Sequence, residues 1–128
     1  MRFPDLGITL WGKPLTSYDA EIVPLEGLPR PDANGCWNIA VAHGFYIGND
    51  PHYSPSYQIT RREIVESGWD YIALGHVPVF NVICHKPVMA CYSGSPQANG
   101  GFLMVDFCEE TGIELRRYSE TTGLIRIP

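Results

Sequence analysis

The chain has 128 residues, a length that suits one domain with a core of its own. Apolar residues make up 45% of it, charged residues make up 18%, and the net charge of −5 argues against loose electrostatic binding to nucleic acid. No apolar stretch approaches the ~20 residues that span a bilayer, and the first residues lack the apolar segment of a signal peptide, so we expect a cytoplasmic protein.

Four cysteines are present, and none forms the C-x-x-C pair that is typical of zinc ribbons or redox sites. We expect reduced thiols rather than disulfides, because no secretory signal precedes them. Cys84, Cys91 and Cys108 lie in strand-like runs and are interpreted as small buried apolar residues; the fourth cysteine is Cys36.

The first part of the chain predicts short strands separated by irregular segments. Residues 8–12 form one strand-like run, and the pattern of residues 18–22 is ambiguous. Proline and glycine predict a loop at residues 25–35 and irregular structure at 48–56. Residues 38–42 are nearly all apolar, as in a strand that is covered on both faces.

A short helix is predicted at residues 61–67. Thr60 suits its N-cap, Glu63 lies three residues later as the partner in a capping box, and Gly68 suits its end. Residues 71–74 form the next strand. A strand, a helix and a strand in succession predict a parallel pair of neighbouring strands.

Each of these two parallel strands is followed by a histidine, His43 and His76. Ligands of open α/β sheets bind beyond the carboxyl ends of the strands, and neutral imidazoles there can bind a metal. A single histidine at the end of a strand is more often structural. Two histidines at the ends of the two strands of one strand–helix–strand unit favour metal ligation. His52, in a proline-rich loop, and His85, before Lys86-Pro87, are expected at surface and turn positions.

The rest of the chain is rich in β-forming residues and predicts an antiparallel meander. Asn99-Gly100 and Thr111-Gly112 are interpreted as hairpin-type breaks between the runs. The four runs are residues 79–84, 88–92, 102–108 and 113–118.

Two further segments resemble known functional loops only superficially. Ser93-Gly94-Ser95-Pro96 lacks the G-x-S-x-G pattern, and no helix is expected after it, so a plain turn is the better interpretation. Gly48-Asn49-Asp50 could offer a carboxylate, but these are ordinary turn residues before a proline. No Walker or G-x-G-x-x-G motif is present.

Taken in order, several segments resemble the C-terminal half of calcineurin-like metallophosphoesterases, and their spacing is most similar to the DNA-repair exonuclease branch. Asp70-Tyr71-Ile72-Ala73-Leu74-Gly75-His76 is similar to the fifth motif of the family and is the most specific match. The resemblance extends over residues 8–118. The other similar segments are Asn38-Ile39-Ala40-Val41-Ala42-His43-Gly44, Tyr92-Ser93-Gly94-Ser95-Pro96 and Gly101-Phe102-Leu103-Met104-Val105.

This resemblance implies a mixed α/β (α+β) fold, namely a single partial domain over residues 1–128 that forms half of an αββα sandwich. It implies hydrolysis of phosphate mono- or diesters at two divalent metals, typically manganese, iron or zinc, about 3.5–4 Å apart. By position, His43 and His76 would each ligate a metal.

Two departures from the family pattern predict an incomplete site. Pro78 stands where the family has a second histidine, and nothing in residues 1–37 matches the three upstream motifs, which carry the carboxylates and the catalytic histidine. We therefore assign no catalytic residue and expect weak or absent activity. The chain would be truncated, or half of a split enzyme that an upstream chain completes.

Two interpretations without catalysis stay open: an inactive partner-binding domain, which Pro78 favours, and a β-rich binding module with structural histidines. If half of the αββα sandwich is missing, strand faces are exposed, and we expect the isolated chain to form oligomers or aggregates. Trp11, Trp37 and Trp69 are expected to face that missing part. A nucleic-acid substrate is compatible with the resemblance, although the charge does not support it.

Overall fold

The computed structural model describes residues 1–17, 19, 21–34, 37–49 and 57–128. Its helices are the 3-10 turn η1 (Pro4–Leu6), α1 (Arg61–Ser67) and α2 (Pro96–Asn99). Its strands are β1 (Arg2–Phe3), β2 (Ile8–Lys13), β3 (Trp37–His43), β4 (Phe45–Gly48), β5 (Gln58–Thr60), β6 (Tyr71–Gly75), β7 (Asn81–Cys84), β8 (Met89–Tyr92), β9 (Gly101–Cys108), β10 (Gly112–Ser119) and β11 (Gly123–Ile127).

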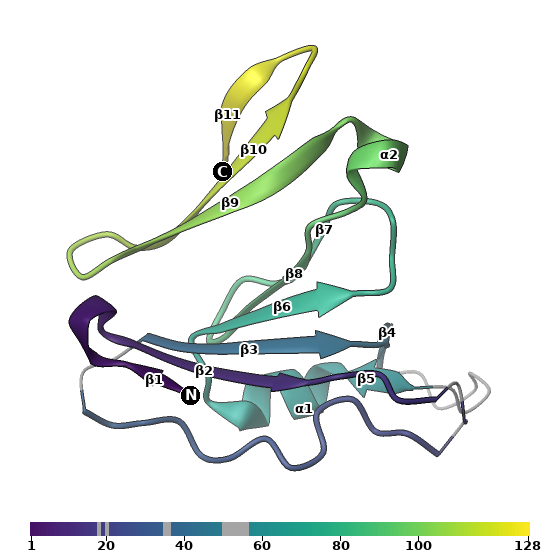
Figure 1. The fold of residues 1–128 in the computed structure, drawn as a ribbon, viewed down its shortest axis with the longest axis vertical. Coiled ribbons are helices and arrows are strands. Elements are labelled where there is room, and N and C mark those ends of the chain that lie inside the picture. Colours follow the sequence, from purple (N-terminus) through teal and green to yellow (C-terminus); the bar gives the residue numbers. More distant parts are fainter. Residues whose placement is uncertain (18, 20, 35–36, 50–56) are drawn as a thin grey trace.

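The strands form a mixed six-stranded sheet in the order β1-β2-β3-β6-β8-β7, and β11, β10 and β9 form a three-stranded antiparallel sheet (Figure 1). A parallel pair, β4 and β5, stands apart from both sheets. The fold is therefore mixed α+β and rich in strand, as the sequence predicted.

The predicted strand–helix–strand unit is confirmed. β3 and β6 are parallel neighbours, with His43 opposite Gly75 at their carboxyl ends. Thr60 Oγ1 accepts a hydrogen bond from the Glu63 amide at 3.2 Å, and Glu63 Oε2 accepts one from the Thr60 amide at 2.8 Å, which completes the capping box. Gly68 ends the helix with a φ of +66°, a conformation that favours glycine.

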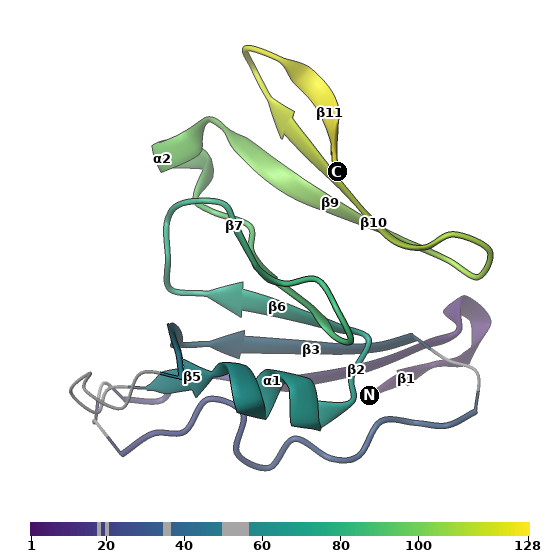
Figure 2. The ribbon, with the colours of Figure 1, turned by 180° about the vertical axis from the view of Figure 1, so that it is seen from behind.

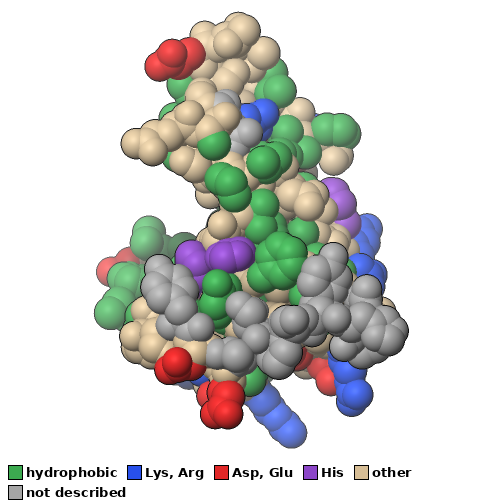
Figure 3. All heavy atoms as spheres, turned by 90° about the vertical axis from the view of Figure 1, so that its right-hand side faces the viewer, with side chains coloured by type: hydrophobic (Ala, Val, Ile, Leu, Met, Phe, Trp, Pro, Cys, Tyr) green, Lys and Arg blue, Asp and Glu red, His purple; other side chains and the backbone are tan. Residues whose placement is uncertain are grey.

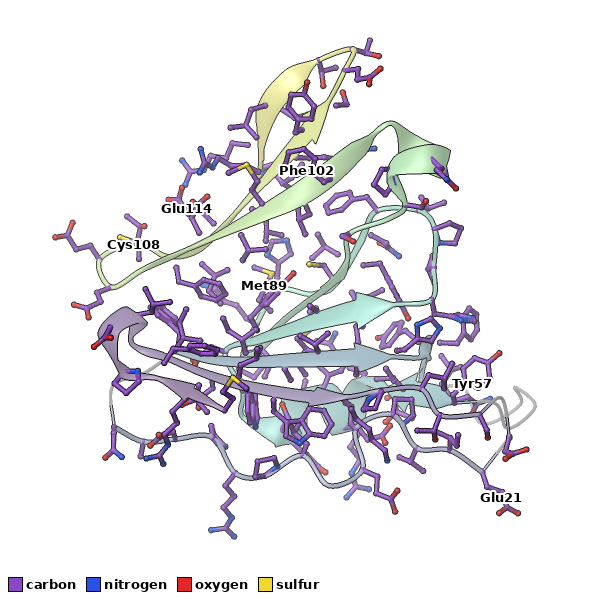
Figure 4. All side chains as sticks on the ribbon, viewed as in Figure 1. Glu21, Tyr57, Met89, Phe102, Cys108 and Glu114 are labelled. Carbon is purple, nitrogen blue, oxygen red and sulfur yellow. The ribbon has the colours of Figure 1, made fainter. Side chains whose placement is uncertain are left out.

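The six-stranded sheet is packed on both faces. Helix α1 lies against one face, and the three-stranded sheet lies against the other (Figures 1 and 2). Met89 extends from β8 into the layer between the two sheets (Figure 4). The core on the helix side contains Leu25, Ala40, Ala42, Ile59, Ile64, Trp69, Ile72, Leu74, Cys84, Val88, Ala90 and Tyr92.

The three-stranded sheet covers only part of the face that it packs on. Phe107 of β9 contacts Trp37 and Tyr71, at the ends where β3 and β6 begin, with ring centroids 5.5 and 5.8 Å apart. Val41 lies on the same face as Trp37, because alternate residues of a strand share a face. Although β3 is an interior strand, Val41 is 46% exposed. The sheet face is therefore uncovered near the histidine end.

The other end of β3 is fixed by a buried polar network. Asn38 is 4% exposed, and its backbone amide donates to Asp70 Oδ2 at 2.7 Å. The Asn38 side-chain amide also donates to Asp70 Oδ2, at 3.2 Å, and to the Asp32 carbonyl at 3.1 Å. Asp70 immediately precedes β6, so this network sets the alignment of β3 and β6.

The predicted meander is correct for two of its pairs, β7 with β8 and β9 with β10, which are antiparallel, but β8 and β9 lie in different sheets. β8 is parallel to β6, and β7 pairs with it antiparallel at the edge of the six-stranded sheet. All four residues of β8 are buried, as in an interior strand that is covered on both faces. Thr111-Gly112 does connect two antiparallel strands, whereas Gly100 ends α2 with a φ of +59° and makes no hairpin.

Several other sequence expectations need correction. β1, β4, β5 and β11 were not anticipated, and the segment Ser93-Gly94-Ser95-Pro96 leads directly into a one-turn helix, α2, which begins at Pro96. Trp69 does not face a missing part: it is 1% exposed, and its indole N–H donates to the Pro29 carbonyl at 2.8 Å. Trp37 is covered in part by Phe107.

The cysteines within the described residues agree with the prediction of unpaired thiols. Cys84 and Cys91 are buried, Cys108 is half-buried, and none of the three forms a disulfide. Burial raises the pKa of the Cys91 thiol to about 11. In the described part of the chain, no helix is long and apolar enough to cross a bilayer.

Candidate metal centre

The two histidines that the sequence singled out lie together at one rim of the six-stranded sheet. His43 is the last residue of β3, and His76 immediately follows β6. His43 Nε2 and His76 Nδ1 are 3.3 Å apart, and the two ring planes are nearly perpendicular, at 81°. Figure 3 views this end of the molecule, where the surface is recessed between the small sheet above and the larger body below.

The separation of these two nitrogens suits a shared metal ion. A zinc ion with two imidazole nitrogens at about 2.0–2.1 Å in tetrahedral geometry places those nitrogens about 3.3–3.4 Å apart. The same 3.3 Å contact is longer than the usual N–H hydrogen bond of about 2.9–3.0 Å. The separation fits two ligands of one ion, and it lies at the long end of the range for an imidazole–imidazole hydrogen bond.

Gly75 gives the His43 ring its space. A Cβ atom at position 75 would lie 3.1 Å from His43 Nδ1, which is closer than an ordinary van der Waals contact. Any side chain at this position would push on the imidazole. Glycine before His76 therefore has a steric role in the site, in addition to any role in the strand.

The backbone is strained where the site is built. Among the described residues, His76 and Tyr57 are the non-glycine residues with positive φ, at +116° and +29°. Their rings are in contact, with centroids 5.2 Å apart, and the Phe45 ring contacts His76 at 5.8 Å. Such conformations cost about 1–3 kcal/mol each and cluster at functional sites. Figure 4 shows Tyr57 at the end of the sheet where β3 and β6 finish.

The electrostatic environment favours the neutral form of His76. Partial burial lowers the pKa of His76, and the positive charge of a protonated His43 lowers it further. A neutral imidazole is the form that binds a metal ion, so both causes favour ligation over protonation.

Among the described residues, the other histidine, His85, does not complete this pair. His85 follows β7 and precedes β8, and it lines a pocket with Trp37 and Asp70 at the opposite end of the sheet. His52 and Asp50 lie outside the described residues. Pro78 has no ligand atom on its side chain. The structure therefore gives His85 no part in replacing the ligand that Pro78 lacks.

Within the described ranges, no group of three or more histidine, cysteine, aspartate or glutamate side chains could hold a metal ion. The pair consequently fits half of the coordination of one ion, and these residues do not fit a centre with two metals. In the segment Ser93-Gly94-Ser95-Pro96, Ser93 Oγ donates to the Gly94 carbonyl at 3.1 Å, and the Ser95 amide donates to the Pro78 carbonyl at 2.9 Å.

Sequence reasoning did not identify the aromatic residues around the pair. Phe45 and Tyr57 contact the His76 ring, and the buried Tyr92 hydroxyl contacts the backbone directly after His43. The sequence placed Tyr92 at the end of a strand-like run of the expected meander, and nothing in the pattern indicated its partners.

No family model matches this chain, and no curated protein or solved structure matches it either.

Proposed function

We propose that this chain is the histidine-bearing part of a metallophosphoesterase-type domain. In this proposal His43 and His76 bind one divalent ion, manganese, iron or zinc, at the carboxyl rim of the six-stranded sheet. The observation that carries the proposal is the 3.3 Å separation of His43 Nε2 and His76 Nδ1. A bound ion there would supply positive charge for the oxygens of a phosphate ester.

The choice of phosphate esters depends on the order of the segments. The order of three segments along the chain is that of the family that the sequence resembles. These segments are the Gly75-His76 turn, the loop Ser93-Gly94-Ser95-Pro96 and β9. The layered arrangement of α1, the six-stranded sheet and the three-stranded sheet is compatible with half of an αββα sandwich. In this proposal the parent activity is hydrolysis of phosphate mono- or diesters, and the chain is cytoplasmic.

The chain by itself should turn over such esters weakly or not at all. Two neutral imidazoles leave the double positive charge of the ion unbalanced, and hard divalent ions prefer carboxylate ligands. The uncovered face around Val41 lies beside the pair. We infer that another polypeptide covers this face and supplies acidic ligands, as in a split enzyme or an oligomer.

A second function has one observation in its favour. Pro78 removes a ligand position from the motif that otherwise matches the family most closely. This substitution favours a domain that has lost catalysis and binds a partner through the same uncovered face. The two functions differ in whether His43 and His76 bind a metal ion.

Metal titration of the purified chain separates them. We expect one zinc ion to bind per chain by calorimetry at pH 7.5, and either His43→Ala or His76→Ala to abolish that binding. The matched control is His85→Ala, which removes an exposed histidine from the opposite end of the sheet and should change nothing. Equal zinc binding by all three variants would contradict the site.

An activity assay tests the second half of the proposal. With manganese and bis(4-nitrophenyl) phosphate, the isolated chain should show no turnover above that of His76→Ala. Turnover that His76→Ala abolishes would show that the chain needs no further ligands and would overturn the inferred partner.

A further inference from the structure

Tyr92 is the last residue of β8, and its side chain reaches the backbone just beyond β3. Its hydroxyl donates to the Gly44 carbonyl at 2.7 Å and accepts a hydrogen bond from the Tyr46 amide at 2.9 Å. Tyr92 lies opposite Leu74 of β6, and Leu74 lies opposite Ala42 of β3. The phenol therefore spans β6 on the helix side of the sheet, and it is 1% exposed.

The corner between β3 and β4 is held from several directions. The Gly44 amide donates to the Gly75 carbonyl at 3.2 Å. A Cβ atom at position 44 would lie 2.6 Å from Pro24 Cγ and 2.7 Å from Ile59 Cδ1, so the corner is closely packed. The Tyr92 hydroxyl joins the carbonyl on one side of this corner to the amide on the other.

His43 lies between the regular end of β3 and this corner. Ala42 is fixed in the strand by its pairing with β6, and Gly44 is fixed by Tyr92 and by the Gly75 carbonyl. With the backbone held on both sides, the His43 side chain starts from a fixed position at the rim, and its Nε2 lies 3.3 Å from His76 Nδ1.

We propose that Tyr92 is a positioning residue of the metal site, whose hydroxyl holds the β3–β4 corner and thereby keeps His43 Nε2 within ligand distance of His76. This inference rests on the proposed metal site. Burial raises the pKa of the Tyr92 phenol, and the Tyr46 amide opposes that effect only in part, so the phenol keeps the proton that it donates to Gly44.

Tyr71 provides a matched control. It is also a buried tyrosine of the same sheet, and its hydroxyl lies 3.1 Å from Cys91 Sγ. Tyr71 contacts the small sheet, on the face opposite to Tyr92, and it begins the strand that Gly75 ends. Removing this hydroxyl deletes a buried polar contact and leaves the β3–β4 corner unchanged.

The test compares Tyr92→Phe with Tyr71→Phe in the full chain. Zinc binding by Tyr92→Phe should weaken by about tenfold or more, as is typical when a group that orients a ligand is lost. Zinc binding by Tyr71→Phe should stay within about twofold of the wild type, since its hydroxyl orients no ligand. Equal zinc affinities for the two variants would overturn the role of Tyr92.

A second measurement keeps this test separate from the proposed function. The imidazole ¹⁵N resonances of metal-free protein at pH 8 report the tautomer and contacts of each ring. Those of His43 should shift in Tyr92→Phe and stay in place in Tyr71→Phe. If the wild type binds no zinc, the proposed function fails, but a shift confined to Tyr92→Phe still supports the positioning role. Unchanged His43 resonances in a folded Tyr92→Phe variant would contradict it.

If Tyr92→Phe does not fold, 3,5-difluorotyrosine at position 92 keeps the ring and the hydroxyl while changing the strength of both hydrogen bonds. The same resonances of His43 should shift in that protein, and their constancy would contradict the proposal.

Discussion

Replacing Asp70 by alanine should destabilise the fold strongly without touching the histidine pair. Asp70 Oδ2 accepts two hydrogen bonds from Asn38, from its backbone amide at 2.7 Å and from its side chain at 3.2 Å. Asn38 is 4% exposed, so water cannot easily replace the lost acceptor. Although the Asp-Tyr pair lies in the segment that resembles a catalytic motif, this geometry gives the aspartate a structural role.

The size of the effect follows from these contacts. Hydrogen bonds to a charged group contribute about 1.5–3 kcal/mol each, and leaving a buried donor without an acceptor costs about 1–3 kcal/mol. The two bonds share one oxygen and are not additive. We therefore expect Asp70→Ala to lower the free energy of unfolding by about 3 kcal/mol, and Asp70→Asn, which keeps one acceptor oxygen, by about half as much.

Urea denaturation followed by tryptophan fluorescence measures this difference, because Trp69 is buried in the core. A loss below ~1 kcal/mol for Asp70→Ala would refute the reasoning, since it would fall within the range of an ordinary surface change. Zinc affinity of the folded variant should be unchanged, because Asp70 and Asn38 lie at the end of β3 opposite to His43. A variant that is stable but binds no zinc would show that Asp70 belongs to the site.

Three further predictions concern the histidine rim. His76→Gly and His76→Ala should both abolish zinc binding and both lose the ring contacts of His76, but His76→Gly should be about 1 kcal/mol more stable than His76→Ala in urea denaturation, because glycine adopts the φ of +116° without strain; equal stabilities of the two variants would contradict the strain. Gly75→Ala should weaken zinc binding about tenfold in calorimetry, since its Cβ would lie 3.1 Å from His43 Nδ1 and would displace the ring; unchanged affinity would mean that the ring position does not matter. In NMR titration His76 should protonate at a lower pH than an ordinary histidine, and His43→Ala should raise that pKa only in part, because burial is the larger cause. Folding lowers the pKa of His76, so its contribution to the free energy of unfolding should be complete above the pKa of His76 in the unfolded chain. This contribution should be lost as the pH falls toward the pKa of His76 in the folded protein. An ordinary pKa for His76 would contradict both the NMR prediction and this pH dependence of stability.

The central unit of the fold could be predicted from short-range patterns. Thr60, Glu63 and Gly68 specify the ends of α1 by local hydrogen bonding and backbone conformation, and the structure has the helix at the predicted residues. One apolar strand precedes this helix and another follows it. Such a strand–helix–strand unit forms a parallel pair of strands, whose carboxyl ends lie at the same rim of the sheet. For this reason the proximity of His43 and His76 followed from sequence alone.

Other features depend on contacts that no local pattern encodes. Met89–Tyr92 has the composition of any buried strand, so its pairing with β6 instead of β9 is decided by tertiary packing. Trp69 was expected to face a missing part, because the Pro29 carbonyl that accepts from its indole N–H lies far away in the sequence. The links of Tyr92 to Gly44 and Tyr46 are equally distant.

A crystal structure of the chain soaked with zinc, with anomalous data collected at the zinc edge, tests the central claim most directly. We predict one strong anomalous peak at the rim, about 2.0–2.1 Å from both His43 Nε2 and His76 Nδ1. A peak on only one of the two imidazoles, or none at this rim while the rings keep their 3.3 Å separation, would contradict the claim that they share an ion.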